Sequence, residues 1–184
     1  MTTKAEMKSF LQFMTTDDAL LGYIGMPALL LKHGTWFKGR TDSDGYAVTK
    51  KWKKKNKPKA KDCYYNAQVF CTEQSGARYF EGYVLVRKGI LPSEHCWVVM
   101  QDGRVVDFTL EAAEVIAAEK GYAVDLRGAL YVGVEVPRGF LVELGLSDCY
   151  EPIAEWFYAE QIKAIAHGWK EPKPPAPGRK RPSP

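Results

Sequence analysis

The sequence has few of the residues that build metal sites or disulfide frameworks. Its four cysteines and three histidines are Cys63, Cys71, Cys96 and Cys149, and His33, His95 and His167. No two cysteines form a Cys-x-x-Cys pair, so a structural zinc site is not expected. Four cysteines in 184 residues are also too few for a fold built on disulfides. We therefore expect free thiols, no metal and no organic cofactor.

Long apolar runs are also missing. The longest, residues 19–31, contains Gly22, Gly25 and Pro27 and is shorter than the ~18–20 apolar residues that cross a bilayer. The N-terminus shows no basic start followed by an apolar stretch and a small-residue cleavage site. We therefore expect a soluble, cytoplasmic protein without a membrane span. No pattern in the sequence specifies an oligomeric state.

Charge is distributed unevenly along the chain. Residues 50–61 hold eight lysines and no acidic residue, and residues 170–184 hold five basic residues and one Glu. Because the net charge of the whole chain is only +4, the remainder is acidic. The lysine-rich segment is either a contact for nucleic acid, an anionic surface or an acidic protein, or a solvated loop. Trp52 alone is too little aromatic content for base stacking, so the solvated loop is the favoured interpretation.

The chain is expected to form a single domain over residues 1–168. A disordered, basic, Pro-rich tail is expected over residues 169–184. Helical spacing predicts a first helix over residues 3–14. A second helix is expected to start at residues 16–18 and to run up to His33, with a break near Pro27. Residues 34–62 are predicted to form a long loop with short strands at 35–37 and 46–48, and the lysine-rich segment 50–61 is part of it.

The second half of the chain predicts a helix, a run of strands and further helices. Asp62 is expected to cap a helix from Cys63 to Glu73. Strands are expected over 77–87, 95–101, 104–108 and 130–136, with a hairpin turn at Asp102-Gly103. Helices are expected over 109–118, 137–145 and 148–166. This order predicts an α+β fold in which helices pack on a small antiparallel sheet.

Cys63, His95 and Asp107 are the candidate catalytic residues. Cys63 is expected in the first turn of its helix, where N–H groups and the helix dipole stabilise a thiolate and bind an oxyanion. His95 and Asp107 flank the predicted hairpin, so Asp107 can orient the His95 ring once a bulge or a longer first strand aligns them. A nucleophile, a base and an orienting carboxylate are the groups that covalent catalysis uses.

Three stretches around these residues resemble the core of the transglutaminase-like superfamily, a branch of the papain-like fold. They are DCYYNAQVF (62–70), ARYFEGYVLVR (77–87) and EHCWVVMQDGRVVDFTL (94–110). His95-Cys96-Trp97 resembles the family's His-small-Trp strand, and Asp107-Phe108-Thr109 resembles its Asp-Pro-Thr strand. Cys96 stands in place of the usual Ala, and Phe108 in place of the usual Pro.

This resemblance implies a papain-like fold and a thioester mechanism. Cys63 is then the nucleophile, His95 the general base and acid, and Asp107 the orienting carboxylate. The family passes the acyl group of an amide to water or to an amine. We expect hydrolysis of a protein or peptide by a peptidase, amidase or deamidase, because short loops leave little room for two large substrates. The resemblance also implies an oxyanion-hole side chain upstream of the cysteine, for which Trp36 and Trp52 are the candidates.

Asn66 and Glu81 are two further substrate-binding or oxyanion candidates. Asn66 lies one turn after Cys63, although an ordinary place on the helix surface is the favoured explanation. Glu81 contacts substrate if its strand lines the cleft. Cys96 alternates with His95 along a strand and is expected to point into the core, and Cys71 and Cys149 are expected to be packing residues.

A binding module is the alternative to an enzyme. Such a protein keeps the papain-like fold without the chemistry. It would use the lysine-rich segment 50–61 and the basic tail to contact an acidic protein or nucleic acid. For the enzyme, the expected partner is a protein or peptide substrate.

Overall fold

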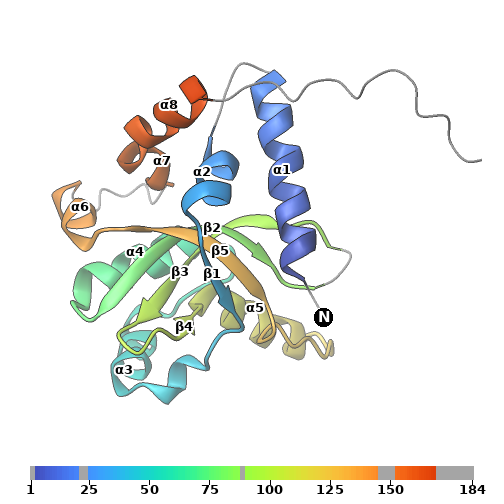
Figure 1. The fold of residues 1–184 in the computed structure, drawn as a ribbon. Helices are drawn as coiled ribbons and strands as arrows, with labels where there is room; N and C mark the ends of the chain where they lie inside the picture. Colours follow the sequence, from blue (N-terminus) through green and yellow to red (C-terminus); the bar gives the residue numbers. More distant parts are fainter. Residues whose placement is uncertain (1–2, 21–24, 88–89, 145–151, 169–184) are drawn as a thin grey trace, which may run out of the picture.

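The structure, a computed structural model, describes residues 3–20, 25–87, 90–144 and 152–168. Its centre is a five-stranded antiparallel sheet in the order β1-β5-β2-β3-β4 (Figure 1). The strands are β1 (Thr35–Lys38), β2 (Ala77–Leu85), β3 (Ser93–Met100), β4 (Val105–Val106) and β5 (Leu130–Val136). The expected α+β class is therefore confirmed.

Eight α-helices occur among the described residues. They are α1 (Lys4–Leu20), α2 (Met26–His33), α3 (Ala47–Asn56), α4 (Cys63–Glu73), α5 (Phe108–Glu119), α6 (Arg138–Glu143), α7 (Ala154–Phe157) and α8 (Ala159–Gly168). Helices α1, α2, α7 and α8 gather at one end of the sheet, where α2 contacts both α1 and α8 (Figure 1). None of the helices in these ranges is long and apolar enough to cross a membrane.

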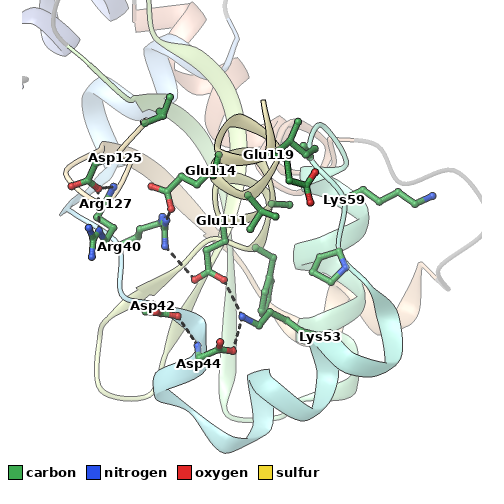
Figure 2. Close-up of a pocket in the computed structure, with 18 residues that line it drawn as sticks. Arg40, Asp42, Asp44, Lys53, Lys59, Glu111, Glu114, Glu119, Asp125 and Arg127 are labelled. Carbon is green, nitrogen blue, oxygen red and sulfur yellow. Dashed lines mark hydrogen bonds and ion pairs between the residues drawn. The ribbon is translucent and has the colours of Figure 1, made fainter. Parts of the chain in front are cut away.

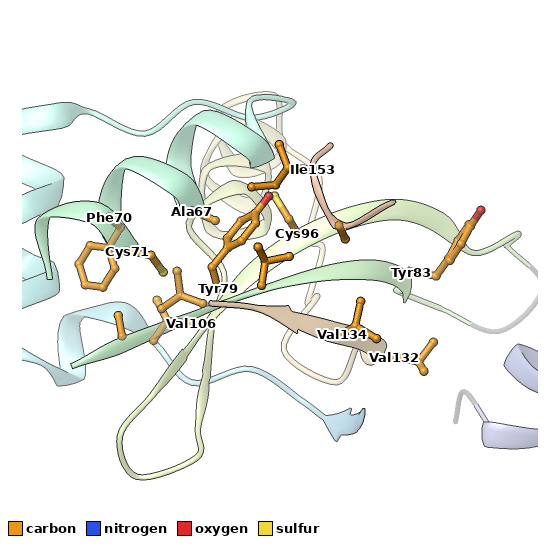
Figure 3. Packing of buried hydrophobic residues seen from close by; sticks show 14 of the residues in the cluster. Ala67, Phe70, Cys71, Tyr79, Tyr83, Cys96, Val106, Val132, Val134 and Ile153 are labelled. Carbon is orange, nitrogen blue, oxygen red and sulfur yellow. The ribbon is translucent and has the colours of Figure 1, made fainter. Parts of the chain in front are cut away.

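The two faces of the sheet carry separate apolar cores, because successive side chains of a strand point to opposite faces. On one face, Tyr79, Cys96 and Val134 pack with Ala67 and Phe70 of α4 (Figure 3). The smaller core on the other face contains Phe80, Val84, Trp97, Val99, Val105, Ala129 and Tyr131. Helix α4 therefore packs on the face of the sheet to which Cys96 points, whereas His95 points to the opposite face.

Two glycines lie in register with His95. Gly82 of β2 pairs with His95 on one side and with Gly133 of β5 on the other. A Cβ at Gly133 would stand 2.5 Å from the Trp97 ring, closer than real Cβ atoms approach. The missing side chain at Gly133 therefore makes room for the buried Trp97 indole on the face that carries His95.

The expected long loop over residues 34–62 is wrong in its central part. The expected strand at 35–37 is present as β1, but residues 47–56 form helix α3, so no strand occurs at 46–48. Trp52 is 3% exposed and packs against Phe70 and Phe108, at ring-centroid distances of 5.3 and 4.7 Å. This contact gives α3 a buried side. The first seven positions of the lysine-rich segment, residues 50–56, are therefore helical. The expected lysine loop is limited to residues 57–61.

The ends of the domain also differ from the sequence expectation. Helix α1 continues through Asp17 to Leu20, so the expected helix start at residues 16–18 is absent. The expected helix over 148–166 is described as two shorter helices, α7 and α8. Asp148, Cys149 and the tail over 169–184 lie outside the described residues.

Candidate active site

Cys63 opens helix α4, as the sequence predicts. Asp62 occupies the N-cap position, but its side chain makes no hydrogen bond to the first turn, so the expected side-chain cap is wrong. The first helical hydrogen bond runs from the Asn66 N–H to the Asp62 carbonyl, at 2.9 Å. The N–H groups of Cys63 and Tyr64 therefore precede the helical ladder, at the end of the helix where the dipole favours an anion.

The ring of His95 and the carboxylate of Asp107 are directly hydrogen-bonded. The distance between His95 Nε2 and Asp107 Oδ2 is 2.7 Å, and both side chains are buried. Val106 of β4 pairs with Val98 of β3. Asp107 follows Val106 by one position, and His95 precedes Val98 by three positions. The two residues are diagonal neighbours on one face, without a bulge.

Four donors hold the carboxylate of Asp107. Besides His95, the hydroxyl of Tyr131 donates to Oδ2 at 3.1 Å. The N–H groups of Thr109 and Leu110 donate to Oδ1 at 3.1 and 3.0 Å, because Asp107 is the N-cap of helix α5 rather than a strand residue. Burial raises the pKa of Asp107, but the charge and hydrogen bond of His95 outweigh it, so the pKa lies below its usual value.

Cys63 and His95 are also hydrogen-bonding partners. Because Nε2 of His95 bonds to Asp107, Nδ1 is the ring nitrogen left for the thiol. The hydrogen bond of Cys96, followed by the hydrogen bond and charge of His95, outweighs burial and lowers the pKa of Cys63 from 9.0 to about 5. The pair therefore favours a thiolate at neutral pH.

His95 takes the complementary charge. Burial alone lowers the pKa of His95, but the charge and hydrogen bond of Asp107, with those of Cys63, raise it to about 10. Between these two pKa values, Cys63 is a thiolate and His95 an imidazolium. In general, a cysteine is most nucleophilic in this thiolate form.

Cys96 has a second contact beyond its expected place in the core. It is 1% exposed, which confirms the expected burial, and its thiol is also a hydrogen-bonding partner of Cys63. Among the residues of β3, only Val98 and Val99 are in register with β4, which leaves His95 and Cys96 on an open stretch of strand edge. Cys63 at the end of α4 can therefore contact residues from both faces of β3.

Neither tryptophan candidate lies at the thiol. Trp52 fills the space between α3, α4 and α5, and it does not line the pocket that contains Cys63. Trp36 is on β1 and lines a different pocket, together with Arg104 and Val105, and not the pocket that contains Cys63. The expected tryptophan donor at an oxyanion hole is therefore not formed by either residue.

Asn66 is a positioning residue instead of a surface residue. It is 1% exposed, and its Nδ2 donates to the Lys59 carbonyl and to the Thr109 hydroxyl, both at 2.8 Å. Since Thr109 also donates to Asp107, Asn66 links the segment that enters α4 to the cap that holds the carboxylate. The expectation that Asn66 lies on the helix surface is wrong.

Glu81 is 2% exposed and lies where helix α7 begins. Its carboxylate accepts hydrogen bonds from the Tyr79 hydroxyl at 2.7 Å and from the N–H groups of Ile153 and Ala154 at 2.9 and 2.8 Å. Burial is the main cause that raises the pKa of Glu81. Glu81 therefore anchors the start of α7 rather than lining a cleft.

An open pocket gives access to Cys63. It has a volume of about 530 Å³ and is lined by Asn56, Lys57, Lys59, Lys61, Asp62, Cys63, Tyr64 and Tyr65. The tyrosines of this wall are not among the candidates that the sequence indicates, and its lysines are indicated only as part of the lysine-rich segment 50–61. Their closeness to Cys63 in the sequence is the signal that could have identified them. Treating residues 50–61 as one solvated loop hides that signal.

A larger pocket of about 900 Å³ lies between α3 and α5, and Cys63 is not part of its wall (Figure 2). Arg40 forms ion pairs with Glu111 and Glu114, and Lys53 forms ion pairs with Asp44 and Glu111 (Figure 2). These pairs neutralise charges across the wall and connect α3 to α5. The reactive thiol therefore belongs to the smaller pocket.

Comparisons of the chain with protein-family models, with curated proteins and with solved structures find no match. The resemblance to the transglutaminase-like superfamily therefore stays a prediction. Function is inferred from the contacts of Cys63, His95 and Asp107 themselves.

Proposed function

We propose that this protein is a cysteine-dependent enzyme that attacks amide or acyl carbonyls and forms a thioester. One observation carries the proposal. Cys63, at the start of α4, contacts a His95 ring whose Nε2 is bonded to Asp107 at 2.7 Å. A thiolate next to an imidazolium that a carboxylate fixes in place supplies both the nucleophile and the proton for a leaving amine.

The first half of the proposed reaction is acylation. The Cys63 thiolate attacks the carbonyl carbon, and the N–H groups of Cys63 and Tyr64 receive the negative charge that develops on oxygen. His95 gives its Nδ1 proton to the leaving nitrogen as the C–N bond breaks. The products are a thioester on Cys63, a free amine and a neutral imidazole.

The second half returns the enzyme to its resting state. Neutral His95 takes a proton from a water molecule, whose oxygen attacks the thioester carbonyl. The C–S bond breaks, which releases the carboxylic acid and restores the thiolate and the imidazolium. We propose hydrolysis rather than transfer to an amine because a pocket of about 530 Å³ has the size of a site for one small ligand or peptide segment.

The finer fold assignment is part of the same proposal. The order of a helix that opens with Cys63, a strand that carries His95 and an aspartate after the next strand supports a transglutaminase-like, papain-like protein. Helix α4 packs on β3, so the nucleophile and the base come from two directly contacting elements.

Acylation by p-nitrophenyl acetate tests this proposal without a known substrate. We expect a burst of p-nitrophenolate close to one equivalent of enzyme, and a mass increase of one acetyl group on the peptide that contains Cys63. Cys63→Ala abolishes the burst, whereas Cys71→Ala keeps it because Cys71 is fully buried. Equal bursts from the wild type and Cys63→Ala would refute the proposal.

A further inference from the structure

The wall of the Cys63 pocket is strongly cationic. Lys57, Lys59 and Lys61 contribute three ammonium groups, whereas Asp62 is the only carboxylate in the wall. Tyr64 and Tyr65 complete the wall next to the thiol. A bound group thus meets a net positive charge within one pocket of the reactive sulfur.

These three lysines differ from Lys53 and Lys55 of the same segment in lacking an acidic partner. Lys53 is paired with Asp44 at 2.6 Å, and Lys55 with Glu73 at 3.0 Å. Among the described residues, Lys57, Lys59 and Lys61 form no ion pair. All three side chains are exposed to solvent.

The backbone that carries these lysines is held in place. Lys57 ends α3 in the left-handed region, with φ 48°, and Lys61 has φ 72° two residues before Cys63. A left-handed conformation costs about 1 kcal/mol or more for a side chain with a Cβ, so neighbouring contacts must maintain it. The carbonyl of Lys59 accepts the hydrogen bond of the buried Asn66, which anchors the centre of the segment.

We infer that the substrate of the Cys63 site carries a negatively charged group, a carboxylate or phosphate, close to the reacting carbonyl, as in an acidic peptide. Lys57, Lys59 and Lys61 are the residues that recognise it. That the bound anion is a substrate depends on the proposed function. The preference of the pocket for anions does not depend on it. This inference assigns a role to three of the eight lysines of segment 50–61.

The size of the effect follows from screened Coulomb interactions. For ammonium groups about 8 Å from the anion in water, three lysines favour an anionic over a neutral reagent about sevenfold at ~0.01 M salt. The same estimate falls to about 2.5-fold at ~0.15 M salt and almost disappears near ~1 M. A steep loss with salt is therefore part of the expected result.

Iodoacetate and iodoacetamide form a matched pair of probes, because they alkylate the same thiolate and differ in charge. The rate of each reaction at Cys63 is followed by mass spectrometry, and the ratio of the iodoacetate rate to the iodoacetamide rate is compared between variants. The pocket variant is Lys57→Gln/Lys59→Gln/Lys61→Gln. The matched control removes the same charge from exposed residues of α3 outside the pocket wall and is Lys50→Gln/Lys51→Gln/Lys54→Gln.

The ratio is expected to fall about sevenfold in the pocket variant at ~0.01 M salt, and the fall is expected to shrink as salt is raised. The control variant is expected to lose much less. An unchanged ratio in the pocket variant, or an equal loss in both variants, would overturn the inference. Measurements repeated near pH 9 yield the same ratio even if Cys63 is an ordinary thiol, so failure of the proposed function and failure of the anion preference are distinguishable.

Discussion

Replacement of Cys96 by alanine removes the contact that contributes most to the low pKa of Cys63. The hydrogen bond from the Cys96 thiol is the largest cause of that lowering, ahead of the hydrogen bond and charge of His95. Cys96 itself stays a thiol, since burial raises its pKa well above the ordinary value. It is therefore a neutral donor to the thiolate, and its loss leaves His95 as the main stabilising group.

The magnitude follows from the strength of a hydrogen bond to a charged group, about 1.5–3 kcal/mol. Since 1.36 kcal/mol corresponds to one pKa unit, the pKa of Cys63 in Cys96→Ala is expected to rise to between about 6 and 7. The nucleophile should remain usable at neutral pH, because His95 and Asp107 are unchanged. Alanine is also the residue that the resembled family has at this position.

The assay is the rate of Cys63 alkylation by iodoacetamide as a function of pH, read by mass spectrometry on the peptide that contains Cys63. Cys71→Ala is the matched control, because Cys71 is an equally buried free cysteine on the same helix as Cys63. We expect the midpoint of the curve to move by one pH unit or more in Cys96→Ala, and to stay near pH 5 in Cys71→Ala. A curve that is unchanged in Cys96→Ala, or that moves equally in both variants, would refute the assigned contact.

Three further predictions concern the carboxylate, its tyrosine partner and the strained backbone. Asp107→Asn removes the charge that raises the pKa of His95 most, so His95 is expected to lose its proton at a pH well below 10, which NMR titration of the imidazole measures. Tyr131→Phe removes a 3.1 Å hydrogen bond to a buried charge, and we expect a loss of about 1.5–3 kcal/mol in the free energy of unfolding, measured by urea denaturation. Lys57→Gly relieves a left-handed φ of 48°, and the free energy of unfolding is expected to rise by about 1 kcal/mol in the same assay.

The pH dependence of stability has a definite sign for the His95–Asp107 pair. The folded pKa of His95 is above its ordinary value of 6.5, so its stabilising contribution is complete below about pH 6.5 and is lost as pH rises toward 10. The folded pKa of Asp107 is below its ordinary value of 3.8, so its contribution is present above about pH 4 and is lost in stronger acid. The two contributions overlap fully between about pH 4 and 6.5.

The three candidate catalytic residues are predictable from sequence because local signals place each of them. The helix that begins at Cys63, the alternating strand around His95 and the Asp102-Gly103 turn all depend on residues a few positions apart. Helix α3 is harder to predict, because its lysines hide an apolar side that consists mainly of Trp52. That side is recognisable only once Phe70 and Phe108 are known to cover it, and these contacts are not local.

The contact between Cys96 and Cys63 is not available from sequence periodicity. Alternation places Cys96 and His95 on opposite faces of β3, which is correct, and therefore predicts that only His95 meets the nucleophile. The short β4 leaves the edge of β3 open at these two residues, so Cys63 contacts both. The length of β4 depends in turn on Asp107, which leaves the strand to cap α5.

The ultraviolet absorbance of the thiolate tests the central claim most directly. The difference in absorbance between the wild type and Cys63→Ser is recorded across the pH range, with His95→Gln as the second variant. We predict that the thiolate of Cys63 appears with a midpoint near pH 5 in the wild type, and that the midpoint moves toward the ordinary thiol range when His95 is replaced. A wild-type midpoint near pH 9 that His95→Gln leaves unchanged would contradict the thiolate–imidazolium pair.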